Sequence, residues 1–135
     1  MNVKPFLDTN ILVYAFTTSD PRRTIAERLI ADGGIVSVQV FNEFVNVSRR
    51  KLRFQWPEVE SALRALRTIL DPPIPLTIDL HESAITLARE HRLAFYDALI
   101  VAAASRTDCA VLFTEDMQDG KRMGTLTIRN PFLAA

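Results

Sequence analysis

The sequence predicts an α/β fold, a parallel sheet of four to five strands with helices on both faces. Short apolar runs alternate along the chain with longer stretches in which apolar residues recur every three or four positions. The first pattern is typical of buried strands and the second of amphipathic helices. Strands that alternate with helices usually form parallel sheets. At 135 residues, the chain is expected to form one domain over residues 1–135.

The first quarter of the chain is expected to contain one strand and two helices. Residues 3–7 form the first predicted strand, and residues 10–16 a helix of one or two turns. Asp20 followed by Pro21 is typical of a helix start, because aspartate favours the N-cap and proline the first helical position. The Asp-Gly-Gly sequence at 32–34 ends that helix, since glycine is common where helices stop.

The middle of the chain is expected to contain a second strand at residues 35–38 and then a helix to about residue 50. After Pro57, apolar residues keep the 3.6-residue period of a helix, which is the clearest helical signal in the chain. That helix ends at the proline-rich residues 71–75, because proline lacks the backbone donor that a helix requires. Residues 76–78 form the third predicted strand.

The last part of the chain is expected to contain two helices and two strands. Asp79 and Glu82 have the spacing of a capping box, at the start of a helix that runs to about His91. Residues 96–106 are apolar on nearly every side, which predicts a buried central helix. The remaining predicted strands lie at residues 110–113 and 125–128.

Charge, cysteine content and hydropathy exclude several classes of protein. The 16 basic and 16 acidic residues cancel, so net charge argues neither for nor against a nucleic-acid partner. With Cys109 as its only cysteine, the chain cannot form an internal disulfide or a thiolate zinc site. The longest uninterrupted apolar run, residues 98–104, is far shorter than the ~20 residues that span a bilayer. With no secretory signal visible, we expect a reduced, cytoplasmic, soluble protein without a membrane partner.

Four acidic side chains lie in segments that are otherwise apolar. They are Asp8, Glu43, Asp97 and Asp116. Each follows a predicted strand or begins a helix at the carboxyl edge of the predicted sheet, where the ligand sites of parallel sheets lie. A single acid in such a place is usually a turn or cap residue. Four of them at one edge favour a functional site instead.

Such a cluster of carboxylates is electrostatically costly. Two like charges about 5 Å apart repel by roughly 3 kcal/mol at an effective dielectric constant of about 20. A bound divalent cation removes this conflict, and a donor set made only of oxygen suits Mg²⁺ or Mn²⁺ rather than zinc. The chemistry that fits is metal-assisted phosphoryl hydrolysis, in which the metal lowers the pKa of a bound water.

The segments around the four acids resemble the acidic motifs of PIN-domain nucleases, and most closely those of VapC-type toxins of type II toxin–antitoxin pairs. The likeness covers almost the whole chain. Each motif alone is a weak signal, whereas four in the family's order are specific. The motifs are FLDTNIL at 6–12, SVQVFNEF at 37–44, YDALI at 96–100 and LFTEDM at 112–117.

The resemblance implies a PIN-like three-layer fold and an active endoribonuclease. The residues that would bind Mg²⁺ or Mn²⁺ and activate water are Asp8, Glu43, Asp97 and Asp116. The polar positions that usually support such a site are Thr9, Asn10 and Thr114. For these three, hydrogen bonding to the backbone at strand ends is an equal alternative. Asp119 lies on the same loop as the fourth acid and is the alternative to it.

The resemblance also implies partners. The substrate would be RNA, a small antitoxin protein would bind and block the site, and the toxin would form a homodimer. A basic run with neighbouring aromatic residues predicts contact with RNA phosphates. It comprises Arg49, Arg50, Lys51 and Arg53. A solvated helix end is the alternative for this run, because cations favour helix C-termini.

Three other functions are weighed against the nuclease. A non-catalytic module would bind RNA or a protein at the same edge without needing metal. A phosphatase with an aspartyl intermediate usually has a second acid two residues after the first, where this chain has Asn10. A Cys–His nucleophile pair is disfavoured, because Cys109 is expected at the edge of the sheet opposite the four acids.

Overall fold

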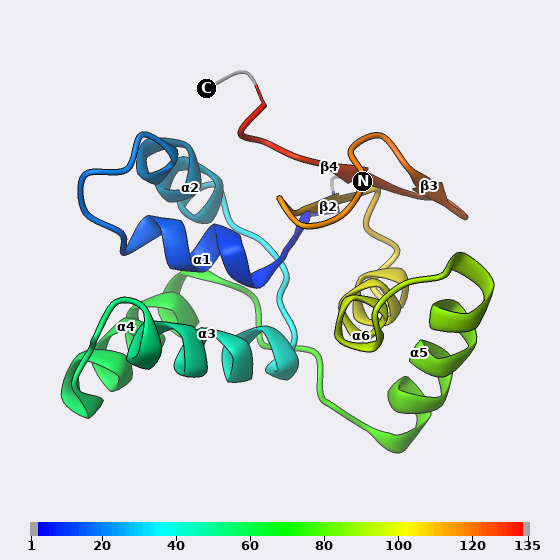
Figure 1. Cartoon of the computed structure of the whole chain (residues 1–135), viewed down its shortest axis with the longest axis horizontal. Helices are drawn as coiled ribbons and strands as arrows, with labels where there is room; N and C mark the ends of the chain where they lie inside the picture. Colours follow the sequence, from blue (N-terminus) through cyan, green and yellow to red (C-terminus); the bar gives the residue numbers. More distant parts are fainter. Residues whose placement is uncertain (1–2, 134–135) are drawn as a thin grey trace.

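Within residues 3–133, which the computed structural model describes, four strands form one sheet in the order β1-β2-β4-β3 (Figure 1). β1 pairs with β2 and β2 with β4 in parallel, whereas β3 is antiparallel to β4. The strands are β1 (Phe6–Leu7), β2 (Val111–Phe113), β3 (Arg122–Met123) and β4 (Leu126–Arg129). The predicted α/β class and the number of strands are therefore confirmed, and the sheet is parallel as predicted except at β3.

The helices lie on different sides of these strands. In Figure 1, α1 to α4 gather to the left of the sheet, and α5 and α6 lie to its lower right. α1 packs against α2 and α3, and α5 packs against α6. The helices in the described part of the chain are α1 (Thr9–Ala15), α2 (Arg22–Ala31), α3 (Val38–Arg50), α4 (Trp56–Ile69), α5 (Ile78–His91) and α6 (Phe95–Ser105). None of them is both long and apolar enough to cross a membrane.

The centre of the sheet is fully buried. Phe6 lies opposite Leu112 in the β1–β2 pair, and Leu112 lies opposite Ile128 in the β2–β4 pair. These three side chains have no exposed surface. Burial of one such side chain stabilises the fold by about 1.5–3 kcal/mol. The carboxyl ends of β1 and β2 are thereby fixed beside each other.

The helix that the sequence predicts to be buried is α6. All of its residues from Ala98 to Ala104 are buried, as the apolar pattern predicts. Four of these seven residues are alanine, whose short side chain lets α5 approach closely. Asp97 lies in the first turn of this helix, next to the buried segment.

The predicted strand at residues 35–38 is wrong. The chain there forms only isolated parallel bridges, at Ile35 and Ser37. Ser37 is the N-cap of α3, because its hydroxyl accepts a hydrogen bond from the backbone N–H of Val40 at 3.2 Å. A serine that caps a helix ends the extended segment before it.

The predicted strand at residues 76–78 is also wrong, for the same reason. Thr77 is the N-cap of α5, and its hydroxyl accepts a hydrogen bond from the N–H of Leu80 at 3.1 Å. The helix therefore begins at Ile78. The predicted capping box is displaced with it, because Asp79 already lies inside the first helical turn.

Smaller differences concern the extent of one strand, the start of one helix and one strand that the sequence does not predict. Of the strand expected at residues 3–7, only Phe6–Leu7 is in the sheet. α2 begins just after Pro21, although the carboxylate of Asp20 accepts a hydrogen bond from the N–H of Arg22 at 2.9 Å, as a cap does. β3 is absent from the prediction because a strand of two residues has no periodicity to detect.

Candidate active site

Asp8 lies at the carboxyl edge of the sheet, between the ends of β1 and β2. Its N–H donates to the carbonyl oxygen of Phe113 at 3.0 Å, which continues the pairing of the two strands. Its carboxylate accepts one hydrogen bond from the N–H of Thr9 at 2.6 Å and another from the hydroxyl of Thr114 at 2.8 Å. The residue is only 3% exposed. Parallel strands that end together thus place Asp8 and Thr114 side by side.

The environment of Asp8 opposes its ionisation. Burial raises its pKa from 3.8 to about 7, because a buried carboxylate loses its hydration. The hydrogen bonds from Thr114 and Thr9 lower the pKa, and the negative charges of Glu43 and Asp116 raise it. A buried acid with nearby like charges is typical of functional sites.

Glu43 approaches the same edge from α3. The hydroxyl of Thr9 donates to Oε1 of Glu43 at 2.7 Å, and the side-chain amide of Gln39 donates to Oε2 at 3.2 Å. Gln39 and Glu43 are four residues apart, so they lie on the same face of the helix. Both carboxylate oxygens are therefore held, one by α1 and one by α3.

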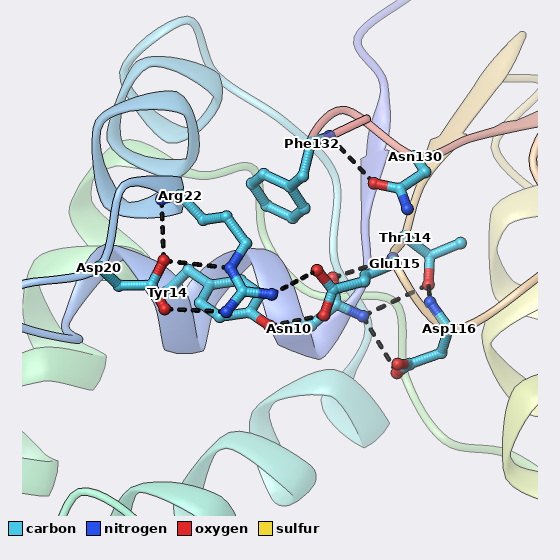
Figure 2. Close-up of polar contacts among 9 residues, drawn as sticks. All are labelled: Asn10, Tyr14, Asp20, Arg22, Thr114, Glu115, Asp116, Asn130 and Phe132. Atoms are coloured by element: carbon cyan, nitrogen blue, oxygen red, sulfur yellow. Dashed lines mark hydrogen bonds and ion pairs between the residues drawn. The ribbon is translucent and has the colours of Figure 1, made fainter. Parts of the chain in front are cut away.

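Asn10 joins the loop after β2 to α1. Its side-chain nitrogen donates to Asp116 at 3.1 Å and to the hydroxyl of Thr114 at 3.3 Å, and its side-chain oxygen accepts from the N–H of Glu115 at 3.2 Å (Figure 2). The N–H of Asp116 also donates to the Thr114 hydroxyl, at 3.1 Å. One amide side chain thus fixes the loop that carries Asp116.

Asp97 completes the cluster from the N-terminal turn of α6. Partial burial raises the pKa of Asp97, and the charges of Asp116 and Glu43 raise it further. Glu43 and Asp116 therefore act on both Asp8 and Asp97. The structure brings the four predicted acids into one electrostatically coupled group.

The four acids do not lie close enough together in this structure to coordinate one metal ion. Among residues 3–133, no three carboxylate, imidazole or thiol side chains lie close enough together to hold one ion. The donor chemistry nevertheless fits a hard divalent cation, because every nearby donor is an oxygen atom and the acids repel one another. The side chains of Thr9, Gln39 and Asn10 hold two of the carboxylates in their present positions.

Asp119 lies apart from this group. Its carboxylate accepts a hydrogen bond from the N–H of Asn130 at 2.8 Å, which ties the loop after β2 to the segment after β4. The residue is exposed. The negative charge of Asp116, by contrast, raises the pKa of both Asp8 and Asp97. Asp116 is therefore electrostatically coupled to Asp8 and Asp97, whereas Asp119 is bonded to the segment after β4.

A second polar network, absent from the sequence-based prediction, adjoins the loop that carries Asp116. The guanidinium of Arg22 pairs with Asp20 at 3.0 Å and with Glu115 at 2.9 Å, and it lies 4.2 Å from the centre of the Tyr14 ring (Figure 2). The hydroxyl of Tyr14 also donates to Glu115. Glu115 immediately precedes Asp116, so this network holds the same loop from the other side. Arg22 and Glu115 are 93 residues apart, and no pattern in the sequence pairs them.

The basic run divides into residues with different surroundings. Arg49 donates to the carbonyl oxygen of Phe54 at 2.9 Å and lies 4.4 Å from the centre of the Trp56 ring. It therefore stabilises the turn between α3 and α4. Lys51 is exposed and lines a cleft of about 540 Å³ that Glu43 also borders. Arg50 and Arg53 are exposed on the surface nearby.

The cysteine and histidines do not reach the acids. Cys109 is buried just before β2, at the edge opposite the cluster, and its thiol contacts the carbonyl oxygen of Ala104 at 3.3 Å. His81 packs against the ring of Phe95, with the ring centres 5.4 Å apart. The Cys109 thiol and the His81 ring thus contact Ala104 and Phe95, respectively, and these contacts do not support a Cys–His nucleophile pair.

The fold and the acidic cluster define the class of protein: an α/β domain whose acidic site lies at the carboxyl edge of a parallel sheet. Residues 6–121 match the family model described as the PIN domain, and the chain belongs to this family. This result confirms the family that the motifs predict.

Solved structures with the same fold include toxins of toxin–antitoxin systems. A toxin–antitoxin complex from Klebsiella pneumoniae is 23% identical, with a TM-score of 0.72, over 95% of this chain and 98% of the other. VapC20 from Mycobacterium tuberculosis, a toxin that cleaves the Sarcin-Ricin loop, is 25% identical, with a TM-score of 0.66, over 82% and 90%. VapBC2 from Rickettsia felis, bound to a DNA fragment from its promoter, is 23% identical, with a TM-score of 0.67, over 93% and 96%. No curated protein sequence matches the chain significantly.

Proposed function

We propose that the protein is a Mg²⁺- or Mn²⁺-dependent endoribonuclease and the toxin of a toxin–antitoxin pair. The observation that carries the proposal is the coupled group of four acids at the carboxyl edge of the sheet, with a buried Asp8 whose pKa is about 7. A protein gains nothing in stability from such a group, so a catalytic use is its best explanation. A structural relative that cleaves the Sarcin-Ricin loop supports RNA as the substrate.

In this proposal, the metal ligands are Asp8, Glu43, Asp97 and Asp116. A cation held by these residues would supply a water of lowered pKa and would neutralise charge that develops on the phosphate. The chain's own contribution is to keep the carboxylates oriented. Hydrogen bonds from Thr114 and Thr9 favour the charged form of Asp8.

The proposed partners follow from the relatives. Two similar structures are described as a toxin–antitoxin complex and as VapBC2 on promoter DNA, so we infer an antitoxin protein that covers the site. A homodimer of this chain is part of the same proposal. The cleft beside the acids, about 540 Å³ in volume, is the region that RNA would enter.

The direct test is an RNA-cleavage assay on the purified protein, free of antitoxin, with Mg²⁺, with Mn²⁺ and with EDTA. Cleavage with either metal and none with EDTA is the expected result. RNA binding without cleavage under all three conditions would instead identify a non-catalytic binding module. Phosphate trapped on Asp8 would identify an aspartyl phosphatase.

Arg22 is expected to be a positioning residue. In Arg22→Gln, the loop that carries Asp116 loses its support from α2, and the cleavage rate should fall roughly tenfold, as small misplacements of catalytic groups do. The Mg²⁺ concentration for half-maximal rate should rise as well, which a purely structural role would not produce. The matched control is Arg23→Gln, because Arg23 forms its ion pair with Glu27 of its own helix, at 3.6 Å, and with no other acid within residues 3–133. Equal rates and Mg²⁺ dependence in the two variants would contradict the prediction.

Lys51 and Arg49 should differ in their effect on RNA binding. Lys51→Ala should weaken binding to all RNA sequences and lower the slope of log Kd against log salt concentration by about one, as loss of one phosphate contact does. Arg49→Ala should leave that slope unchanged and lower the melting temperature, because Arg49 stabilises the turn after α3. Binding titrations at several salt concentrations measure the slope for each variant, and thermal melting measures the stability of Arg49→Ala. The reverse result would place the phosphate contact at Arg49.

A further inference from the structure

A second hollow borders the candidate site, beside the cleft that Lys51 lines. It has a volume of about 390 Å³ and is lined by Gln39, Asn42, Glu43, Asn46 and Tyr96. Glu43 and Asn46 line this hollow and the larger cleft as well, so the two adjoin across one face of α3. An extended ligand that passes the acids can therefore occupy both.

Tyr96 is unusual for an aromatic residue so close to a buried cluster. It is 64% exposed, although it directly precedes Asp97 and the fully buried part of α6. Its ring has one aromatic neighbour, Phe95, in an edge-to-face arrangement with the ring centres 5.9 Å apart. That contact leaves a ring face open to solvent, which has an energetic cost unless a ligand covers it.

The side-chain amides of Asn42 and Asn46, which also line the hollow, can form hydrogen bonds to a ligand. Among residues 3–133, the side chains of Asn42 and Asn46 make no hydrogen bond to another residue, and both are exposed. Gln39 differs, because its amide is bonded to Glu43 at 3.2 Å. Asn42 and Asn46 are four residues apart and therefore share a face of α3. Each offers a donor and an acceptor to a ligand in the hollow.

We propose that Tyr96, Asn42 and Asn46 form a subsite that binds one unpaired base of the RNA substrate next to the phosphate that is cut. An exposed aromatic ring stacks on a base, and amide side chains read its hydrogen-bonding edge, as is usual in sequence-specific recognition of single-stranded RNA. The backbone would then run past the acids toward Lys51. The inference rests on the proposed function and deepens it, since it makes the substrate single-stranded at the cut site and the cut selective for a base.

The test is cleavage of a single-stranded RNA pool with randomised sequence, followed by sequencing of the products. Tyr96→Leu should raise KM roughly tenfold or more, the usual effect of losing one base–aromatic stack, with kcat nearly retained. Tyr96→Phe keeps the ring and should retain the wild-type KM. Asn42→Ala and Asn46→Ala should flatten the base preference at one position beside the cut. Ile85→Ala on α5, also an exposed apolar side chain, is the control.

The outcomes separate the subsite from the proposed function. If Tyr96→Leu keeps the KM and base preference of the wild type while Asp97→Asn is inactive, the subsite is overturned and the nuclease stands. If the wild type shows no metal-dependent cleavage, the proposed function fails. RNA affinity then decides on the subsite: equal affinity of wild type and Tyr96→Leu overturns it, and weaker affinity of the variant supports it.

Discussion

Asp97→Asn should abolish RNA cleavage, with a loss of at least roughly 100-fold in kcat. The substitution keeps the shape of the side chain and removes its charge. Among the described residues no hydrogen bond depends on the Asp97 carboxylate, and burial together with the charges of Asp116 and Glu43 raises its pKa. Its removal should therefore leave the fold intact, or slightly stabilise it. Cleavage rates and thermal melting, measured on the same preparations, test both parts.

The matched control is Asp119→Asn. Asp119 accepts a hydrogen bond from the N–H of Asn130, and the side-chain oxygen of asparagine can accept the same bond. Cleavage by this variant should stay near the wild-type rate, whereas Asp116→Asn should lose activity as Asp97→Asn does. Loss of activity in Asp119→Asn and retention in Asp116→Asn would reverse the assignment of the fourth acid.

Without metal, the protein should become less stable as the pH rises from about 4 to about 7. The pKa of Asp8 is raised from 3.8 to about 7 in the folded protein. In this pH range the unfolded chain has lost the Asp8 proton, whereas the folded chain retains it. Each increase in pH therefore lowers the free energy of the unfolded state relative to the folded state. The free energy of unfolding should therefore be lower above pH 7 than below pH 4, by up to roughly 4 kcal/mol.

Asp8→Asn isolates this effect, because asparagine does not titrate. In EDTA, the melting temperature of the wild type should fall between pH 5 and pH 8 by roughly 10 °C, and that of Asp8→Asn should change much less. Mg²⁺ should restore the melting temperature of the wild type at pH 8, because a ligand that binds the folded state stabilises it. Parallel pH profiles for the two proteins would show that Asp8 is not the group responsible. The cleavage assay is not needed for this measurement.

The sequence predicts the helices better than the strands, for a physical reason. α4 and α6 have long periodic or fully apolar patterns, and both are found where the sequence places them. The strands have two to four residues, too few for a period of two to be distinguished. At Ser37 and Thr77, a side-chain cap converts the expected strand into the start of a helix.

The acids of the site are predictable, whereas the residues that hold them are only partly so. Asp8, Glu43, Asp97 and Asp116 are conspicuous because each is polar in an apolar segment, and topology places them at one edge. Gln39 is not conspicuous, although its amide holds Glu43. Partners such as Arg22 and Glu115 depend on side-chain positions that only the three-dimensional structure provides.

The hydrogen bond between Thr114 and Asp8 joins residues 106 positions apart, from the first strand and the end of the second. A chain emerging from the ribosome therefore lacks this site until β2 has been synthesised and has paired with β1. A truncated or half-made chain contains Asp8 and Glu43 without Asp116. Under the proposed function, this order of assembly keeps the nascent chain inactive until the loop that carries Asp116 has been synthesised and has folded against α1.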